Sequence, residues 1–138
     1  MSLTRDEFIS KHFPEVDPGR EPLGNKITVQ LMSVPKKSMG GIILTEQTKD
    51  FNKQATTVAR VVKMGQIAYK DRSSGETWKE GAWCDLGDLV LVHRYGGLNR
   101  VEVPRSDDPE DVVIFATYND FDVLDKITGQ FEVYSDIL

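Results

Sequence analysis

The chain has little of what a chemical site usually requires. Its 138 residues include one cysteine, Cys84, and two histidines, His12 and His93. A single cysteine excludes an intramolecular disulfide and any multi-cysteine metal site. The glycine-rich nucleotide fingerprint, the phosphate-binding loop and the zinc-binding helix motif are also missing. We therefore expect no catalytic residues, no metal and no cofactor, and we do not expect an enzyme.

Long apolar runs and dense positive charge are also missing. No stretch approaches the ~20 residues that a membrane helix needs, and the first sixteen residues lack the continuous apolar core of a signal peptide. The formal net charge is −5, and no basic patch is dense enough to neutralise a phosphate backbone. The sequence thus predicts a cytoplasmic protein with neither a membrane nor a nucleic acid as partner.

The few residues that could take part in catalysis or metal binding have ordinary structural interpretations. His93 is expected at the end of a strand with its ring partly exposed. Cys84 has no adjacent cation, so a packed or half-exposed thiol is expected. One acidic loop lacks the oxygen spacing of a calcium site and is expected to be a solvated turn. Its acidic residues are Asp107, Asp108, Glu110 and Asp111.

The N-terminal residues predict one short helix. Thr4 can cap residues 4–12, and Glu7 stands three residues later, as in a capping box. Phe8, Ile9 and Phe13 would form one apolar face. Prolines and Gly19 follow, so this segment is interpreted as a short appendage leading into the domain.

From residue 22 the apolar period becomes two residues, which is typical of strands. Ile27, Val29 and Leu31 alternate with other residues and predict a half-buried strand. Further strands are predicted at 56–64, 89–92, 101–103, 112–116 and 121–124, with a hairpin excursion whose arms are 66–69 and 76–79. Many short strands and no long helical period indicate an all-β antiparallel barrel or sandwich.

The triplet Ile42-Ile43-Leu44 stands out because glycines, lysines and amides surround it. Short apolar runs between turns are usually buried strands. A connection of some twenty residues with this composition is, however, uncommon in a compact domain and more often functional. Both interpretations, a strand and an exposed ligand for another protein, remain open at this point.

The order of five motifs resembles the GroES-like co-chaperonins, the chaperonin-10 family. The most specific motif is the loop sequence KSMGGIIL at 37–44. The others are PLGNKITV at 22–29, ARVVKMG at 59–65, LGDLVLV at 86–92 followed by YGG, and the closing run 112–124. Each motif is weak alone, but five in family order are specific.

The resemblance implies a fold and a function. The fold would be a small antiparallel β-barrel with a long mobile loop and a roof hairpin. A homo-oligomeric ring, a heptamer in the family, would cap a GroEL-type chaperonin and assist the ATP-dependent folding of unfolded client proteins, with the ATP bound by the partner. The implied chaperonin-binding residues are Gly40, Gly41, Ile42, Ile43 and Leu44.

The resemblance also implies that the excursion 66–85 is the roof hairpin. Its candidate residues are Tyr69, Trp78 and Trp83. The two tryptophans would either line the inner surface of the dome or pack the hairpin against the barrel, and their large buried area favours packing.

The resemblance covers residues 22–124, which leaves 1–21 as an N-terminal extension and 125–138 as a C-terminal tail. The extensions, the long excursion and Asn25 in place of the family's usual Asp look like a phage or otherwise specialised version. Two alternatives differ in class. A zinc alcohol dehydrogenase domain would need a ligand set and a nucleotide-binding domain that this chain lacks, and a phage structural or assembly protein would use the barrel without chaperonin binding.

Overall fold

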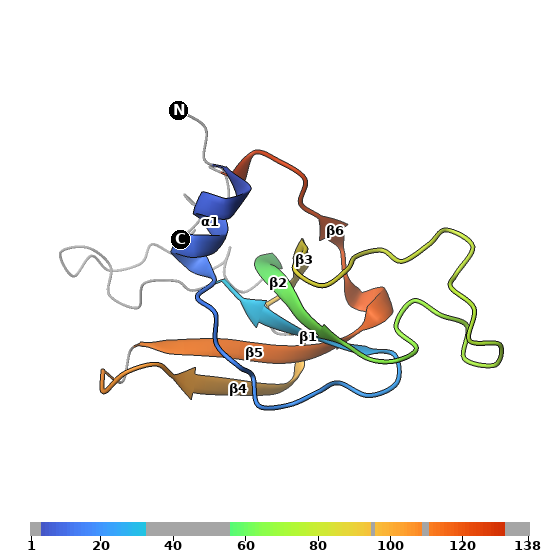
Figure 1. Cartoon of the computed structure of the whole chain (residues 1–138), viewed down its shortest axis with the longest axis horizontal. Coiled ribbons are helices and arrows are strands. Elements are labelled where there is room, and N and C mark those ends of the chain that lie inside the picture. The colour runs from blue at the N-terminus through green and yellow to red at the C-terminus, as the bar shows by residue number, and fades with distance from the viewer. Residues whose placement is uncertain (1–3, 33–55, 95, 109–110, 132–138) are drawn as a thin grey trace.

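The computed structural model describes residues 4–32, 56–94, 96–108 and 111–131 (Figure 1). The predicted binding residues 40–44 lie outside this part of the chain. The elements in order are helix α1 (Arg5–His12), strands β1 (Lys26–Leu31), β2 (Thr56–Met64), β3 (Leu89–His93), β4 (Leu98–Pro104) and β5 (Val112–Asn119), the 3-10 helix η2 (Asp120–Asp122), and β6 (Asp125–Lys126).

The described strands form one antiparallel sheet of six strands in the order β4-β5-β1-β2-β3-β6. This confirms the all-β antiparallel class. Among the described residues the ladder is not closed into a barrel, because β4 and β6 are its edges and are not paired with each other. No helix in this part of the chain is long and apolar enough to span a bilayer.

The main core lies on one face of the central strands. Ile27, Val29 and Val61 are fully buried there, together with Val90 and Tyr118. Successive side chains of a strand point to opposite faces, so the alternating apolar residues of β1 reach the same core. Burying each aliphatic side chain contributes about 1.5–3 kcal/mol, which makes this cluster the main source of stability.

The second face of β1 is also covered, so the prediction of a half-buried strand was wrong. Thr28 is 0% exposed, Gln30 2% and Met32 6%. The side-chain amide of Gln30 donates a 2.9 Å hydrogen bond to the carbonyl oxygen of Pro14. The segment after α1 therefore packs on β1, a long-range contact that the strand's own sequence pattern does not encode.

Helix α1 confirms its predicted cap. The Thr4 hydroxyl accepts a 3.2 Å hydrogen bond from the backbone N–H of Glu7 and donates one of 2.9 Å to the Glu7 carboxylate. The predicted apolar face is used, since Phe8 and Phe13 are buried and Ile9 is partly buried. In Figure 1 α1 lies over the end of β1, while the excursion 66–85 extends away on the opposite side of the molecule.

One predicted strand assignment was wrong, and one was right only in part. The arms of the excursion are paired antiparallel as in a hairpin, but only at one bridge, Lys70 with Thr77, flanked by backbone hydrogen bonds from Asp71 to Glu76 and from Trp78 to Tyr69; they form no extended strands. The run 121–124 begins inside η2, and the strand that follows it, β6, starts only at Asp125 and pairs with β3. The chain turns there because Asp120 enters a buried network described below.

Candidate functional site

The predicted loop is carried by two paired strands. It leaves the described structure after Met32, next to the end of β1, and returns at Thr56, the first residue of β2. Leu31 is opposite Ala59 in the β1–β2 register, and the backbone N–H of Met32 donates a 2.9 Å hydrogen bond to the carbonyl oxygen of Val58. We call Met32 and Val58 with this bond the neck of the loop.

A second apolar cluster surrounds the neck. Both neck residues are buried, Met32 at 6% and Val58 at 3% exposure. The cluster draws residues from both ends of the chain as well as from β3. Its members are Phe8, Phe13, Met32, Val58, Leu89, Ile127 and Phe131. The Phe8 ring lies 6.0 Å from that of Phe13 and 5.6 Å from that of Phe131, so the N-terminal helix and the C-terminal segment meet over the neck.

The excursion 66–85 contains an ordered polar turn at residues 71–75. One carboxylate oxygen of Asp71 accepts hydrogen bonds from the hydroxyl of Ser73 at 2.7 Å and from the backbone N–H groups of Ser73 and Ser74. These bonds, that of the Ser73 hydroxyl first, lower the pKa of Asp71 because they favour its charged form. The carboxylate thereby shapes the turn between the two arms of the excursion.

Three aromatic rings at the base of the excursion are in mutual contact. The ring centroids of Tyr69 and Trp78 are 5.4 Å apart at 88°, those of Trp78 and Trp83 are 5.4 Å apart at 69°, and those of Tyr69 and Trp83 are 5.7 Å apart. Edge-to-face pairs of this kind are favourable by about 0.5–1.5 kcal/mol beyond area burial. The predicted roof residues thus lie together. Tyr69 is fully buried, Trp78 packs on the main core and Trp83 is 36% exposed.

Tyr69 is also held at its polar end and at its backbone. Its hydroxyl lies 3.3 Å from the Cys84 sulfur, and its backbone N–H donates a 2.9 Å hydrogen bond to the Asp120 carboxylate. Burial, followed by the Cys84 contact, raises the pKa of Tyr69 well above its usual range. Burial likewise raises the pKa of the Cys84 thiol. Cys84 is 3% exposed, so of the two expected states, packed or half-exposed, the thiol is packed.

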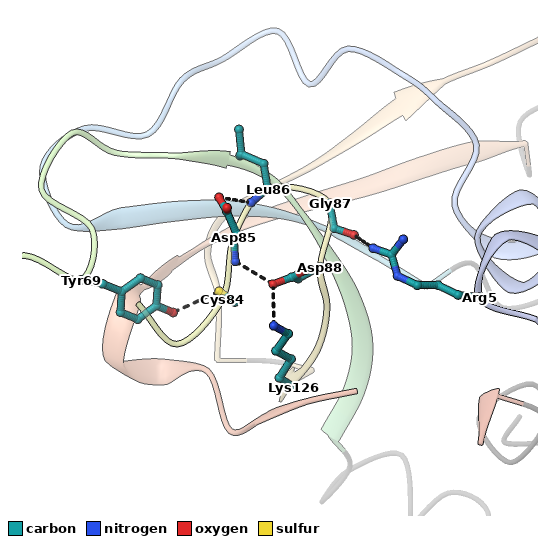
Figure 2. Close-up of polar contacts among 8 residues, drawn as sticks. All are labelled: Arg5, Tyr69, Cys84, Asp85, Leu86, Gly87, Asp88 and Lys126. Atoms are coloured by element: carbon teal, nitrogen blue, oxygen red, sulfur yellow. Dashed lines mark hydrogen bonds and ion pairs between the residues drawn. The ribbon is translucent and has the colours of Figure 1, made fainter. Parts of the chain in front are cut away.

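The turn after the excursion is fixed by both ends of the chain (Figure 2). A guanidinium nitrogen of Arg5 in α1 donates a 2.6 Å hydrogen bond to the carbonyl oxygen of Gly87. The Asp88 carboxylate accepts a 2.8 Å bond from the Asp85 backbone N–H and lies 3.3 Å from the Lys126 ammonium group. The N-terminal helix and β6 therefore contact the same turn that leads into β3.

Asp120 is the residue that sequence reasoning missed. It is 1% exposed, and besides Tyr69 its carboxylate accepts a 3.3 Å bond from the side-chain amide of Asn25. Its backbone N–H donates to the Asn25 carbonyl oxygen at 3.0 Å. In the sequence Asp120 looks like a polar turn residue. The only sequence signal for its buried role was its partner Asn25, which stands where the resembled family has an acid.

The remaining candidates lie apart from these groups. His93 is exposed at the end of β3, as predicted. Asp107 and Asp108 are exposed, Asp111 pairs with Arg105 at 3.3 Å, and Glu110 lies outside the described residues. No group of three His, Cys, Asp or Glu residues in the described ranges could hold a metal ion.

The comparisons with known proteins agree with this geometry. A family model, described as the chaperonin 10 Kd subunit, matches residues 20–119. This range contains all of β1 to β5, the neck and the excursion. The chain belongs to the chaperonin 10 Kd subunit family.

Curated relatives bear similar names. "Co-chaperonin GroES" of Lactobacillus helveticus is 34% identical over 79 residues, which are 57% of this chain and 76% of that protein. "Co-chaperonin GroES" of Lactobacillus acidophilus is 33% identical over the same shares. The resemblance to the GroES-like co-chaperonins is thereby confirmed, and the chaperonin 10 family is not an enzyme family.

Proposed function

We propose that this chain is a co-chaperonin that caps a GroEL-type chaperonin and so assists ATP-dependent folding of enclosed client proteins. The observation that carries the proposal is the family match over residues 20–119, a range that includes the motif KSMGGIIL at 37–44. The ATP would be bound by the chaperonin. Gly40 and Gly41 would give the backbone its freedom, and Ile42, Ile43 and Leu44 would enter an apolar groove on the partner.

The energies favour weak binding by one loop and firm binding by several loops together. Burying three large aliphatic side chains gives about 5–8 kcal/mol in total, from ~1.5–3 kcal/mol each. Ordering a long loop on binding costs about 2–5 kcal/mol or more. A single loop would therefore bind weakly, whereas several loops on one ring act at high effective concentration. Capping would then be firm but reversible when the nucleotide state of the chaperonin changes.

A ring of identical subunits, seven by resemblance to the family, completes the proposal. The described sheet has two open edges, and edge strands of this kind pair readily with another chain. Next to the short edge strand β6 the side chains of Phe121 and Leu124 are 58% and 43% exposed. Pairing between neighbours would cover both the free backbone groups and these apolar side chains.

The test is complex formation with a defined chaperonin. The wild-type chain is mixed with GroEL of Lactobacillus helveticus and ATP, and a co-migrating complex is measured by size exclusion. Ile43→Asp should abolish the complex while leaving the fold intact. The matched control is Leu23→Asp, the same kind of change at a position that is 72% exposed before β1 and outside both edge strands, which should bind normally. Wild-type binding by Ile43→Asp would refute the role of the triplet. An assembly protein without chaperonin binding predicts no complex at all.

A further inference from the structure

A groove lies between the segment after α1, strand β2 and the turn before β3. Its volume is about 530 Å³, which is in the range of small-molecule sites. Residues 15–18 line it from the N-terminal segment, 60–63 from β2, and 86–87 from the turn, with Gln30 of β1 also contributing. The groove is separate from the predicted loop motif at 37–44 and from the aromatic cluster of the excursion.

The walls of the groove are fixed by hydrogen bonds. The side-chain amide of Gln30 holds the N-terminal segment through the Pro14 carbonyl oxygen. The backbone N–H of Gly87 donates a 2.7 Å bond to the carbonyl oxygen of Val61, and the carbonyl oxygen of Gly87 accepts the bond from Arg5 (Figure 2). The groove is therefore formed before any ligand enters, which lowers the ordering cost of binding.

Arg60 brings an unpaired cation to this groove. It is half-buried and lines the groove from β2. Its Nε atom is shielded from solvent and has no hydrogen-bond partner among the described residues, and no carboxylate in that part of the chain forms an ion pair with it. Buried guanidinium groups are normally paired, because desolvation without a partner is costly. An anionic ligand would supply the missing partner.

The other charges of the groove limit the charge of that ligand. The lining holds two cations, Arg60 and Lys63, and two acids, Glu15 and Asp17, so the formal charges cancel. Lys63 is only loosely engaged, since its ammonium group lies 3.7 Å from the exposed carboxylate of Glu21. The Asp17 carboxylate accepts a 3.0 Å bond from the backbone N–H two residues later. This balance favours a monoanion, because a second negative charge would have no cation left to meet.

The rest of the lining is suited to an apolar body. Its apolar side chains are Val16, Pro18, Val62 and Leu86. Leu86 is 60% exposed, and in Figure 2 its side chain points away from Asp88 and Lys126. A ligand that covers Leu86 removes apolar surface from water and gains about 25 cal/mol per Å².

We propose that this groove binds an organic carboxylate, with the carboxylate on the Arg60 guanidinium and the apolar body along Val62 and Leu86. A guanidinium matches a carboxylate because both groups are planar and two N–H donors can meet two oxygens. The same chemistry is carried by a small fatty acid and by the carboxyl end of a peptide. The inference goes beyond the proposed function and does not depend on a chaperonin.

The test is a titration of the full chain with hexanoate, followed by nuclear magnetic resonance of the Arg60 side-chain Nε–H. Saturable shifts are expected in the wild type. Arg60→Met should weaken binding at least about tenfold, as loss of a charged hydrogen-bond partner does. The matched control is Arg72→Met, at an exposed position of the excursion, which should bind within about twofold of wild type. For both variants the backbone amide of Val62 reports the binding. Equal affinity of the two variants overturns the proposal.

Three further probes define the ligand. Hexanamide, which has the same body without the charge, should bind at least about tenfold more weakly than hexanoate. Inorganic phosphate should also bind more weakly, and tighter binding of phosphate would refute the carboxylate assignment. Acetyl-alanyl-leucine is compared with its amide. Tighter binding than hexanoate by the free acid identifies a peptide end as the ligand, weaker binding identifies a small acid, and equal binding of acid and amide contradicts the role of the carboxylate.

Two measurements guard against a purely structural role of Arg60. If its guanidinium has no partner inside the protein, Arg60→Met should not lower the urea midpoint of unfolding. A lower midpoint would reveal a structural partner and overturn the proposal. Leu86→Ser should weaken hexanoate binding several-fold without affecting the fold, whereas Leu23→Ser, at a position that is 72% exposed and outside the groove lining, should not. Unchanged affinity in Leu86→Ser would exclude the apolar part of the site.

Discussion

The carboxylate of Asp120 accepts a 2.9 Å hydrogen bond from the backbone N–H of Tyr69, a residue 51 positions earlier in the chain. It thereby joins the end of β5 to the start of the excursion 66–85. The same carboxylate is bonded to Asn25 at the start of β1. One buried acid therefore fastens three distant segments, and the aromatic cluster is built on that attachment.

Removing this carboxylate should destabilise the whole domain. Asp120→Ala leaves the Tyr69 N–H buried without a partner, and we expect a loss of about 2–4 kcal/mol in the free energy of unfolding, measured in urea. Asp120→Asn keeps one acceptor oxygen and should lose roughly half as much. A free energy of unfolding for Asp120→Ala that equals the wild-type value would show that the network contributes nothing.

Asn25→Asp should be unfavourable for an electrostatic reason. It would place a second carboxylate within hydrogen-bond distance of Asp120, which is 1% exposed, and two close carboxylates cannot both stay charged. We expect Asn25→Asp to be less stable than wild type at neutral pH, with the difference shrinking in the double variant Asn25→Asp, Asp120→Asn. Thermal melting of wild type, Asn25→Asp, Asp120→Asn and the double variant measures this coupling. Additive effects would contradict it.

Gly65→Ala tests a close backbone approach. A Cβ atom at Gly65 would collide with the carbonyl oxygen of Gly24 and lie 3.0 Å from that of Lys26, both of which are backbone atoms that cannot rotate away. We expect a loss of about 1–3 kcal/mol in urea unfolding. The matched control is Gly129→Ala, whose Cβ would meet nothing within 4 Å. It should be close to neutral, and equal losses would exclude the steric explanation.

The two tryptophans should differ in solvent access. Trp78 packs on the main core, whereas Trp83 is 36% exposed. Acrylamide quenching of Trp83→Phe, which reports Trp78 alone, should therefore be weaker than quenching of Trp78→Phe, which reports Trp83. If the proposed ring forms, repeating the measurement in the capped complex shows whether Trp83 remains accessible. Stronger quenching of Trp78 would contradict the packing described above.

Stability should fall at alkaline pH. Burial raises the pKa values of Cys84, Tyr69 and Tyr118, so the folded chain holds these protons more tightly than the unfolded chain. The stabilisation is complete below the ordinary pKa values of 9.0 for cysteine and 10.0 for tyrosine, and it is lost as the pH rises above them. Urea unfolding between about pH 8 and pH 10.5 should show this decline, with a shallower slope in Tyr69→Phe. A constant free energy of unfolding across that range would refute it.

The sequence by itself determined the local features. Strand periodicity identified β1 and β2, Thr4 and Glu7 specified the start of α1, and the motif order indicated the family. These depend on neighbouring residues, whose spacing fixes which side chains share a face. The residues 40–44 were also found from the sequence alone, and their binding role stays a prediction because they lie outside the described structure.

Only the tertiary structure decided what covers each surface. The outer face of β1 is buried because the segment after α1 packs on it, and the excursion is fixed to the sheet by the bond from the Tyr69 N–H to the Asp120 carboxylate. The neck is enclosed by residues from both ends of the chain. Such contacts join positions far apart in the sequence, so their energies depend on the folded arrangement and leave no periodic trace in the chain.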